Sequence, residues 1–134
     1  MSYTKIKGYI LSVIDNKKIK IEINEEESLN KMNNLLSKLK KNKMYKLPRD
    51  KECNNRFYIN INDKTKYQFK NINYDNLSDL YGLEVSITFY HKYYHFQNKN
   101  VKIDNDEESK KNNIFYIGYY FIATKLNNIH IFNS

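Results

Sequence analysis

The side chains best suited to catalysis or metal binding are few in this chain and widely spaced. The single cysteine, Cys53, lies in a polar stretch, and His91 and His95 fall four residues apart. These two histidines would share one side of a strand and, with Cys53 or His130, could bind zinc, but suitably spaced third and fourth ligands are missing. Neither a glycine-rich phosphate loop nor a nucleophile elbow occurs. We therefore expect no enzyme activity, no metal and no cofactor.

Lysine and tyrosine are the residues that point to binding chemistry. The 134 residues include thirteen tyrosines and carry a formal net charge of +8. The first seventy residues hold seventeen basic and eight acidic side chains, whereas the remainder is slightly acidic. The basic residues are densest between positions 38 and 51, where Lys38, Lys40, Lys41 and Lys43 form a second basic patch. Such a field attracts polyanions, nucleic acid above all, although a solvated helix face gives the same pattern.

The composition also suggests where such a chain would be encoded. Asparagine, lysine, isoleucine and tyrosine, which have A/T-rich codons, supply more than half of the residues. This bias is typical of an AT-rich genome, such as that of a large DNA virus or a linear plasmid. Mutational drift alone could make the chain basic and rich in tyrosine, so the placement of these residues is more informative than their number.

Hydrophobic periodicity predicts a β-hairpin followed by a helix. Residues 6–14 form one long strand with a bulge expected near Gly8, and residues 18–23 alternate isoleucine with charged side chains. A helix is expected over residues 25–42, because acidic residues open it, lysines close it and one apolar stripe repeats at helical spacing. The stripe consists of Leu29, Met32, Leu36 and Leu39.

The rest of the chain is expected to be mostly strands, within a single domain covering residues 1–134. Residues 56–69 suit a second hairpin, and residues 75–81 suit a short helix that Gly82 ends. Strands are then expected at residues 83–96, 114–126 and 129–132, with a charged, mobile loop at 98–113.

About six short strands with a helix before the penultimate pair predict a mainly β chain, a five- to six-stranded antiparallel barrel with helices. From Leu80 through Gly82 to Phe89, the sequence resembles the OB-fold family. In that family a long first strand bends at a glycine, and a helix precedes strands four and five. The segment 25–44, with its amphipathic helix, would be an insertion. The competing fold is an α+β sandwich with helix 25–42 on one sheet face.

The resemblance implies a binding groove on strands two and three and on the loops between strands one and two and strands four and five. Tyr58 is the best candidate for base stacking, because its neighbours Phe57 and Ile59 should face the core. Contacts made mainly by lysine predict sequence-tolerant, salt-sensitive binding. The candidate nucleic-acid-binding residues are Lys18, Lys20, Arg56, Tyr58, Lys64, Lys66, Lys92, Tyr93 and Tyr94.

These features favour a nonenzymatic protein that binds single-stranded DNA or RNA. The alternative is a small structural or accessory subunit of a viral particle or polymerase assembly, with replication or transcription proteins as partners. The sequence lacks an apolar run long enough to span a membrane, and residues 1–7 lack the apolar core of a signal peptide. A single cysteine fits a reducing compartment. We expect an intracellular location, in the cytoplasm or a virion, and no membrane partner.

Overall fold

The computed structural model describes residues 2–39, 45–69, 76–96 and 116–128. Several expectations lie outside the described residues. They are Lys40, Lys41 and Lys43 of the second basic patch, the loop 98–113 and the strand 129–132.

The sheet begins with an antiparallel meander, as the alternation of isoleucine and charged residues predicts. Asp15 and Asn16 both adopt positive φ angles, 52° and 54°, in the turn between the first two strands. The irregularity expected near Gly8 lies two to four residues further along the first strand, between Ile10 and Ser12. The strands of the meander are β1 (Thr4–Ile14), β2 (Lys18–Glu22) and β4 (Arg56–Asn60).

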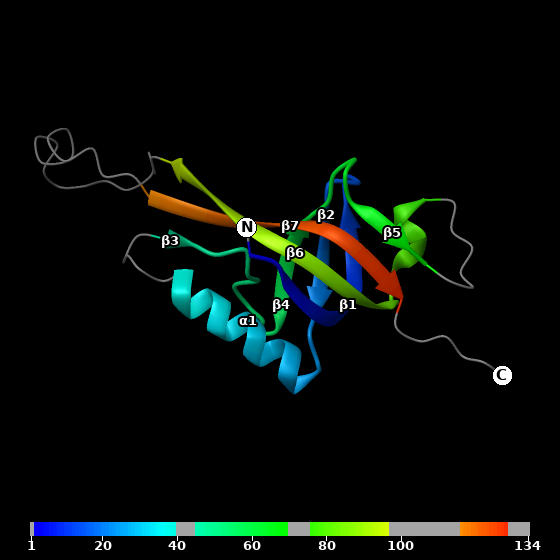
Figure 1. Cartoon of the computed structure of the whole chain (residues 1–134), viewed down its shortest axis with the longest axis horizontal. Helices are drawn as coiled ribbons and strands as arrows, with labels where there is room; N and C mark the ends of the chain where they lie inside the picture. The colour runs from blue at the N-terminus through cyan, green and yellow to red at the C-terminus, as the bar shows by residue number, and fades with distance from the viewer. Residues whose placement is uncertain (1, 40–44, 70–75, 97–115, 129–134) are drawn as a thin grey trace, which may run out of the picture.

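A long antiparallel hairpin of β6 (Glu84–Phe96) and β7 (Tyr116–Asn128) closes this meander into a barrel. β6 also pairs with β1, and β7 meets β4 in parallel at Asn60 and Ile122. The five strands therefore close in the order β1-β2-β4-β7-β6 (Figure 1). The chain is mainly β, a barrel with helices, and not the competing α+β sandwich. The barrel is mixed, and not wholly antiparallel as expected, because β4 and β7 run in the same direction.

Two short strands, β3 (Tyr45–Lys46) and β5 (Lys66–Gln68), also pair in parallel with β7. The expected hairpin at residues 56–69 is therefore wrong, since β5 pairs with β7 and not with β4. Buried Thr65 accounts for this change of partner. Its hydroxyl donates to the Ala123 carbonyl at 2.8 Å and so holds the chain against β7.

The expected short helix before β6 is a 3-10 helix, η1 (Leu77–Leu80), in the described part of that segment. Asn76 accepts a hydrogen bond from the backbone N–H of Ser78 and so caps the first turn. Gly82 follows with φ of +81°, which is the left-handed conformation expected of it.

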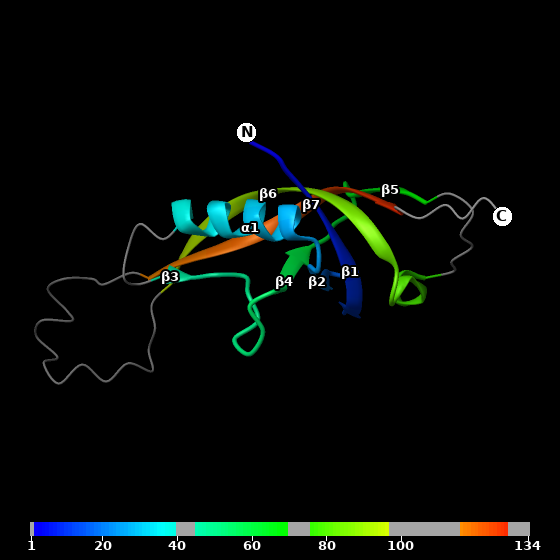
Figure 2. The same ribbon diagram turned by 90° about the horizontal axis from the view of Figure 1, so that it is seen from below.

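The amphipathic helix α1 (Glu26–Leu39) connects β2 to β3 and packs its apolar stripe on the barrel core. Met32, Leu36 and Leu39 are buried in the same cluster as barrel residues such as Ile6 and Phe57. Both views show α1 running alongside the β6–β7 hairpin, near the start of β1 (Figures 1 and 2). The predicted helix and its buried face are confirmed over the described residues.

The helix is expected to depend on Met32 for its attachment to the barrel. Because this side chain is fully buried, Met32→Ala should leave a cavity and lower the free energy of unfolding by about 2–5 kcal/mol. Urea denaturation followed by circular dichroism measures the loss. The control is Ser37→Ala, at an exposed position of the same helix, which should retain the wild-type midpoint. Equal midpoints for the two variants would contradict this packing.

Candidate nucleic-acid interface

The outer surface of β2 and β4 brings together the central residues predicted from the sequence. Side chains alternate along both strands, so Ile19, Ile21, Phe57 and Ile59 are buried and their neighbours face outwards. The antiparallel register places Lys18 opposite Asn60, Lys20 opposite Tyr58 and Glu22 opposite Arg56. We call this surface the β2–β4 face; it comprises Lys18, Lys20, Glu22, Arg56, Tyr58 and Asn60.

Tyr58 and two lysines form the centre of the β2–β4 face. The ammonium groups of Lys18 and Lys20 lie 5.3 and 5.6 Å from the centroid of the Tyr58 ring. Each contact falls within the range of a cation–π interaction, which contributes ~0.5–1 kcal/mol at an exposed site. The half-buried ring is therefore held in place beneath two positive charges.

Two carboxylates reduce the positive charge of this face. Lys20 forms an ion pair of 2.8 Å with Asp50, and Arg56 lies 3.5 Å from Glu22. Lys18 has no carboxylate partner among the described residues. Its ammonium group thus remains available to an anion from solution.

Asp50 reaches the β2–β4 face because its loop folds back along β4. The backbone N–H of Tyr58 donates to the Pro48 carbonyl, and that of Asp50 donates to the Arg56 carbonyl. Arg49 fastens the same loop, since its guanidinium donates to the Asn54 carbonyl at 3.0 Å. The sequence did not predict this arrangement. The one signal was that Asp50 is the single acid within the basic run 38–51.

The pairing of Lys20 with Asp50 shifts both pKa values. The hydrogen bond from Lys20 lowers the pKa of Asp50 below its ordinary value, and the backbone N–H of Glu52 acts in the same direction. The hydrogen bond to Asp50 raises the pKa of Lys20. Both groups therefore stay charged over the neutral range.

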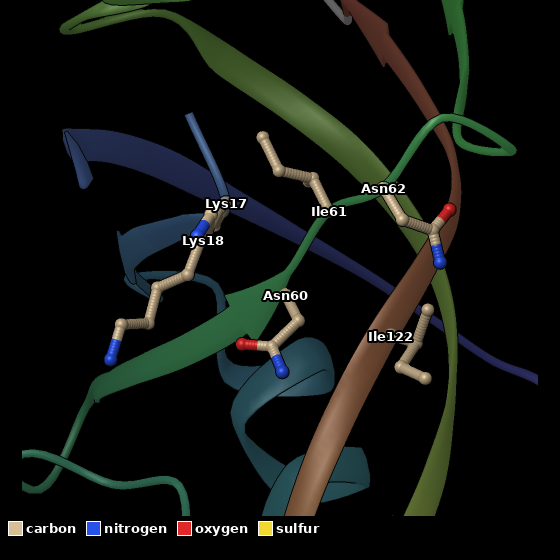
Figure 3. A pocket seen from close by; sticks show the side chains of 6 residues that line it. All are labelled: Lys17, Lys18, Asn60, Ile61, Asn62 and Ile122. Atoms are coloured by element: carbon tan, nitrogen blue, oxygen red, sulfur yellow. The ribbon is translucent and has the colours of Figure 1, made fainter. Parts of the chain in front are cut away.

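A pocket of about 330 Å³ adjoins the β2–β4 face where β4 meets β7. Figure 3 shows the Asn60 side chain between these strands, with Lys18 on one side and Ile122 on the other. Lys17, Ile61 and Asn62 complete the lining. The pocket thus combines amide groups, which both donate and accept hydrogen bonds, with positive charge and an apolar wall.

The other predicted residues lie away from this centre. Lys64 and Lys66 are exposed, in the turn after β4 and on β5. Lys92, Tyr93 and Tyr94 are exposed on β6, which β7 separates from β4.

The two neighbouring tyrosines on β6 face opposite sides of the hairpin, as consecutive strand residues must. The Tyr93 side chain is 63% exposed and that of Tyr94 is 40% exposed. Tyr94 lies over Gly118, where a Cβ atom would collide with its ring, and 5.9 Å from the centroid of Tyr120. Tyr94 and Tyr93 therefore cannot contribute to one continuous stacking surface.

The described segments lack the side-chain cluster that a metal site needs and the long apolar helix of a membrane span. They contain no group of three or more histidine, cysteine, aspartate or glutamate residues that could hold a metal ion. Cys53 is a half-buried free thiol in the loop before β4. Within the same segments, no helix has the length and apolar character of a membrane span.

Removing the Asp50 carboxylate is expected to change stability only where that carboxylate is ionised. Because its folded-state pKa is lowered, its contribution is present above the ordinary value of 3.8 and is lost as the pH falls towards the folded-state pKa. The stability difference between wild type and Asp50→Asn should therefore be largest near neutral pH and shrink below about pH 4. Urea midpoints at several pH values measure it. Glu52→Gln, an exposed position in the same loop, serves as the control, and an equal pH dependence in both variants would refute the role of Asp50.

Comparisons with protein-family models, with curated proteins and with solved structures found no match to this chain.

Proposed function

We propose that this protein binds single-stranded DNA or RNA through the β2–β4 face and catalyses no reaction. The observation that carries the proposal is the placement of Lys18 and Lys20 over the Tyr58 ring. Proteins that bind single strands combine positive charge, which follows the phosphates, with aromatic rings on which bases stack. These two elements occur here at one point of the barrel surface.

Each part of the β2–β4 face has a distinct task in this proposal. A base takes the place of the two ammonium groups over the Tyr58 ring, and stacking on an aromatic side chain contributes ~1–3 kcal/mol per base. Lys18 contacts a neighbouring phosphate, since no described carboxylate neutralises it. A nucleic-acid phosphate competes with Asp50 for Lys20, which adds to the salt dependence of binding.

The pocket beside Asn60 offers room for the edge of an adjacent base. Bases of single strands are unstacked and present their hydrogen-bonding edges to protein side chains. The Asn60 amide can donate to one base and accept from another, so it does not demand one sequence. Lys64, Lys66, Lys92 and Tyr94 would extend the contact along a longer strand.

The barrel topology supports an OB-type assignment as part of the same proposal. β1, β2 and β4 form a meander, and β6 and β7 close the barrel as a Greek key does. In OB-folds the second and third strands carry the ligand-binding face, and here those strands are β2 and β4. Helix α1 lies between them in the sequence, as the insertion expected from the sequence.

Exposed tyrosines favour the second candidate, a structural or accessory subunit of a viral particle or polymerase assembly. Tyr3, Tyr81 and Tyr93 are each more than half exposed, and tyrosine is enriched at protein interfaces. Light scattering on the purified chain separates the two candidates when combined with oligonucleotide titration. Self-assembly without oligonucleotide binding would favour the subunit.

Replacing Tyr58 is expected to weaken the binding of a labelled single-stranded oligonucleotide. Tyr58→Leu removes the stacking ring and should raise the Kd by about ten- to a hundredfold, while Tyr58→Phe keeps the ring and should change the Kd little. Tyr81→Leu, at a site 70% exposed near η1, is the surface control. Urea midpoints establish that each variant is folded. Equal Kd values for wild type and folded Tyr58→Leu would refute stacking on Tyr58.

The salt dependence of binding is a second test of the β2–β4 face. Lys18→Gln removes one phosphate contact, so the slope of log K against log salt should fall by ~0.7 for a single strand. Titrations between about 50 and 200 mM salt measure this slope. Lys51→Gln, an exposed position in the loop before β4, is the charge-matched control. Absence of binding by the wild type at low salt would refute the function itself.

A further inference from the structure

A second cavity bordered by lysines lies on another part of the barrel, between α1 and the first residues of β1. β2 pairs with β1 only from Tyr9 onwards, whereas β6 pairs with β1 from Thr4 to Tyr9. Within the described part of the chain, the first residues of β1 therefore have one edge without a strand partner. Helix α1 covers this edge, and a cleft of about 640 Å³ lies between them.

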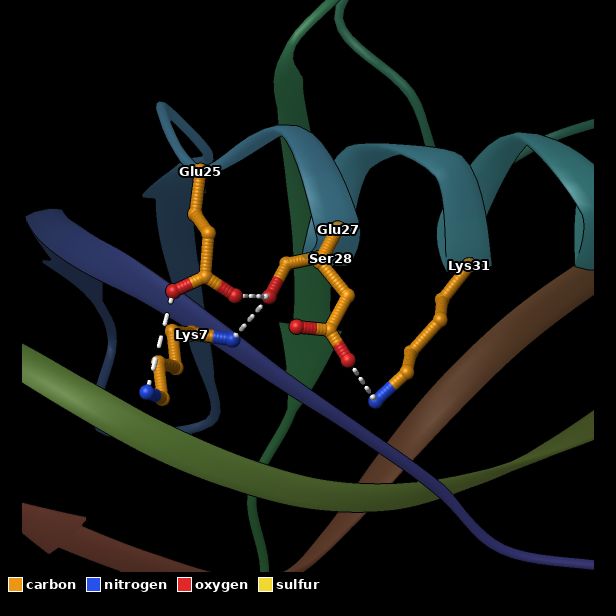
Figure 4. Close-up of polar contacts among 5 residues, drawn as sticks. All are labelled: Lys7, Glu25, Glu27, Ser28 and Lys31. Carbon is orange, nitrogen blue, oxygen red and sulfur yellow. Dashed lines mark hydrogen bonds and ion pairs between the residues drawn. The ribbon is translucent and has the colours of Figure 1, made fainter.

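The first turn of α1 is anchored to the open edge of β1 (Figure 4). The backbone N–H of Lys7 donates to the Ser28 hydroxyl at 2.9 Å, and this hydroxyl donates to Glu25. The Lys7 ammonium group also lies 3.7 Å from Glu25. These contacts hold the first turn of α1 against β1.

The same contacts show which way the neighbouring backbone groups point. In an antiparallel pair, successive residues alternately direct their N–H and C=O groups towards the partner strand and away from it. Lys7 directs its N–H away from β6, to Ser28, so Lys5, two residues earlier, directs its N–H to the same side. The Lys5 amide is thus a backbone donor that faces the cleft.

The side chains around the cleft are mostly basic or polar, above an apolar floor. Positive charge comes from the ammonium groups of three lysines, Lys5, Lys31 and Lys38, and the floor from Leu35 and Leu39. Among the residues that the structure describes, no carboxylate lines it. Glu27 lies 3.7 Å from Lys31, but both side chains are at least half exposed, so this pair is weak. The remaining lining residues are Ser2, Tyr3, Thr4, Asn34 and His91.

We infer that this cleft binds the phosphomonoester group of a nucleotide. A phosphomonoester carries about two negative charges at neutral pH and several acceptor oxygens, which match the lysines and the Lys5 amide. The base would rest on Leu35 and the Tyr3 ring. The volume falls within the range of ~300–1,000 Å³ that small-molecule sites occupy. The site is separate from the β2–β4 face and does not rest on the function proposed for that face.

Two sources could supply this group, a free mononucleotide or the phosphorylated end of a nucleic-acid strand. Both present the same phosphomonoester and base. Lys38 connects the cleft with the basic run predicted from the sequence, and it lies in the last turn of α1.

The test is an NMR titration of the full chain, labelled with ¹⁵N, using adenosine 5′-monophosphate, inorganic phosphate and adenosine as separate probes. The nucleotide should shift the Lys5 and Asn34 amide signals saturably, and more tightly than either probe that lacks the base or the phosphate. Lys31→Gln with Lys38→Gln should weaken this binding about tenfold or more, because two charge-assisted contacts are lost. The control Lys51→Gln, outside the cleft, should bind as wild type does.

Further measurements distinguish the two sources and separate the cleft from the β2–β4 face. A 5′-phosphorylated oligonucleotide that shifts Lys5 more tightly than its unphosphorylated form identifies a strand end, and a response to the mononucleotide alone identifies a small ligand. Tyr58→Leu should leave the Lys5 shifts intact, so failure of the β2–β4 face and failure of the cleft are distinguishable. A Lys5 amide unmoved by adenosine 5′-monophosphate and by the phosphorylated oligonucleotide overturns the inference, as does equal affinity for inorganic phosphate.

Discussion

The arrangement of this molecule depends on β1 being shared between two partners. Its first half pairs with β6 and its second half with β2, and Tyr9 is the residue that pairs with both strands. Gly8 precedes this point, and a Cβ atom there would lie 3.1 Å from the Glu22 carbonyl oxygen, so a side chain would crowd the end of β2. Because β2 ends opposite Tyr9, no described strand pairs with this edge of the first half of β1. Helix α1 covers the edge instead.

The same strand positions determine what the barrel presents to solvent. Alternation along β2 and β4 directs four large apolar residues into the core and leaves lysine and tyrosine on the outside. Asp50 then limits the positive charge of that surface, since its loop is bound to β4 and carries the carboxylate to Lys20. The β2–β4 face is consequently a surface of moderate positive charge around the Tyr58 ring.

The local elements of the fold could be predicted from the sequence, because their signals are local. Alternating isoleucines indicated the first hairpin, and Met32, Leu36 and Leu39 at helical spacing indicated the buried face of α1. The pairing of β5 could not be predicted in this way. A turn after β4 favours a hairpin, and only the contact between Thr65 and Ala123, distant in sequence, shows why the chain departs from it. The position of Asp50 likewise depends on a loop that pairs with β4 across the surface.

The ion pairs show which of the described basic side chains are neutralised by a carboxylate and which are not. Lys7, Lys20, Lys31 and Arg56 each pair with a carboxylate, and all four lie in the basic first seventy residues. The lysines left without a carboxylate include Lys18 on the β2–β4 face, and Lys5 and Lys38 in the cleft beside α1. A drift towards AT-rich codons explains why lysine is abundant, but it does not by itself place Lys18 beside a tyrosine ring or Lys5 and Lys38 beside a cavity. Because an unpaired ammonium group attracts an anion more strongly than a neutralised one, the proposed binding at the β2–β4 face depends most on Lys18, and that at the cleft most on Lys5 and Lys38.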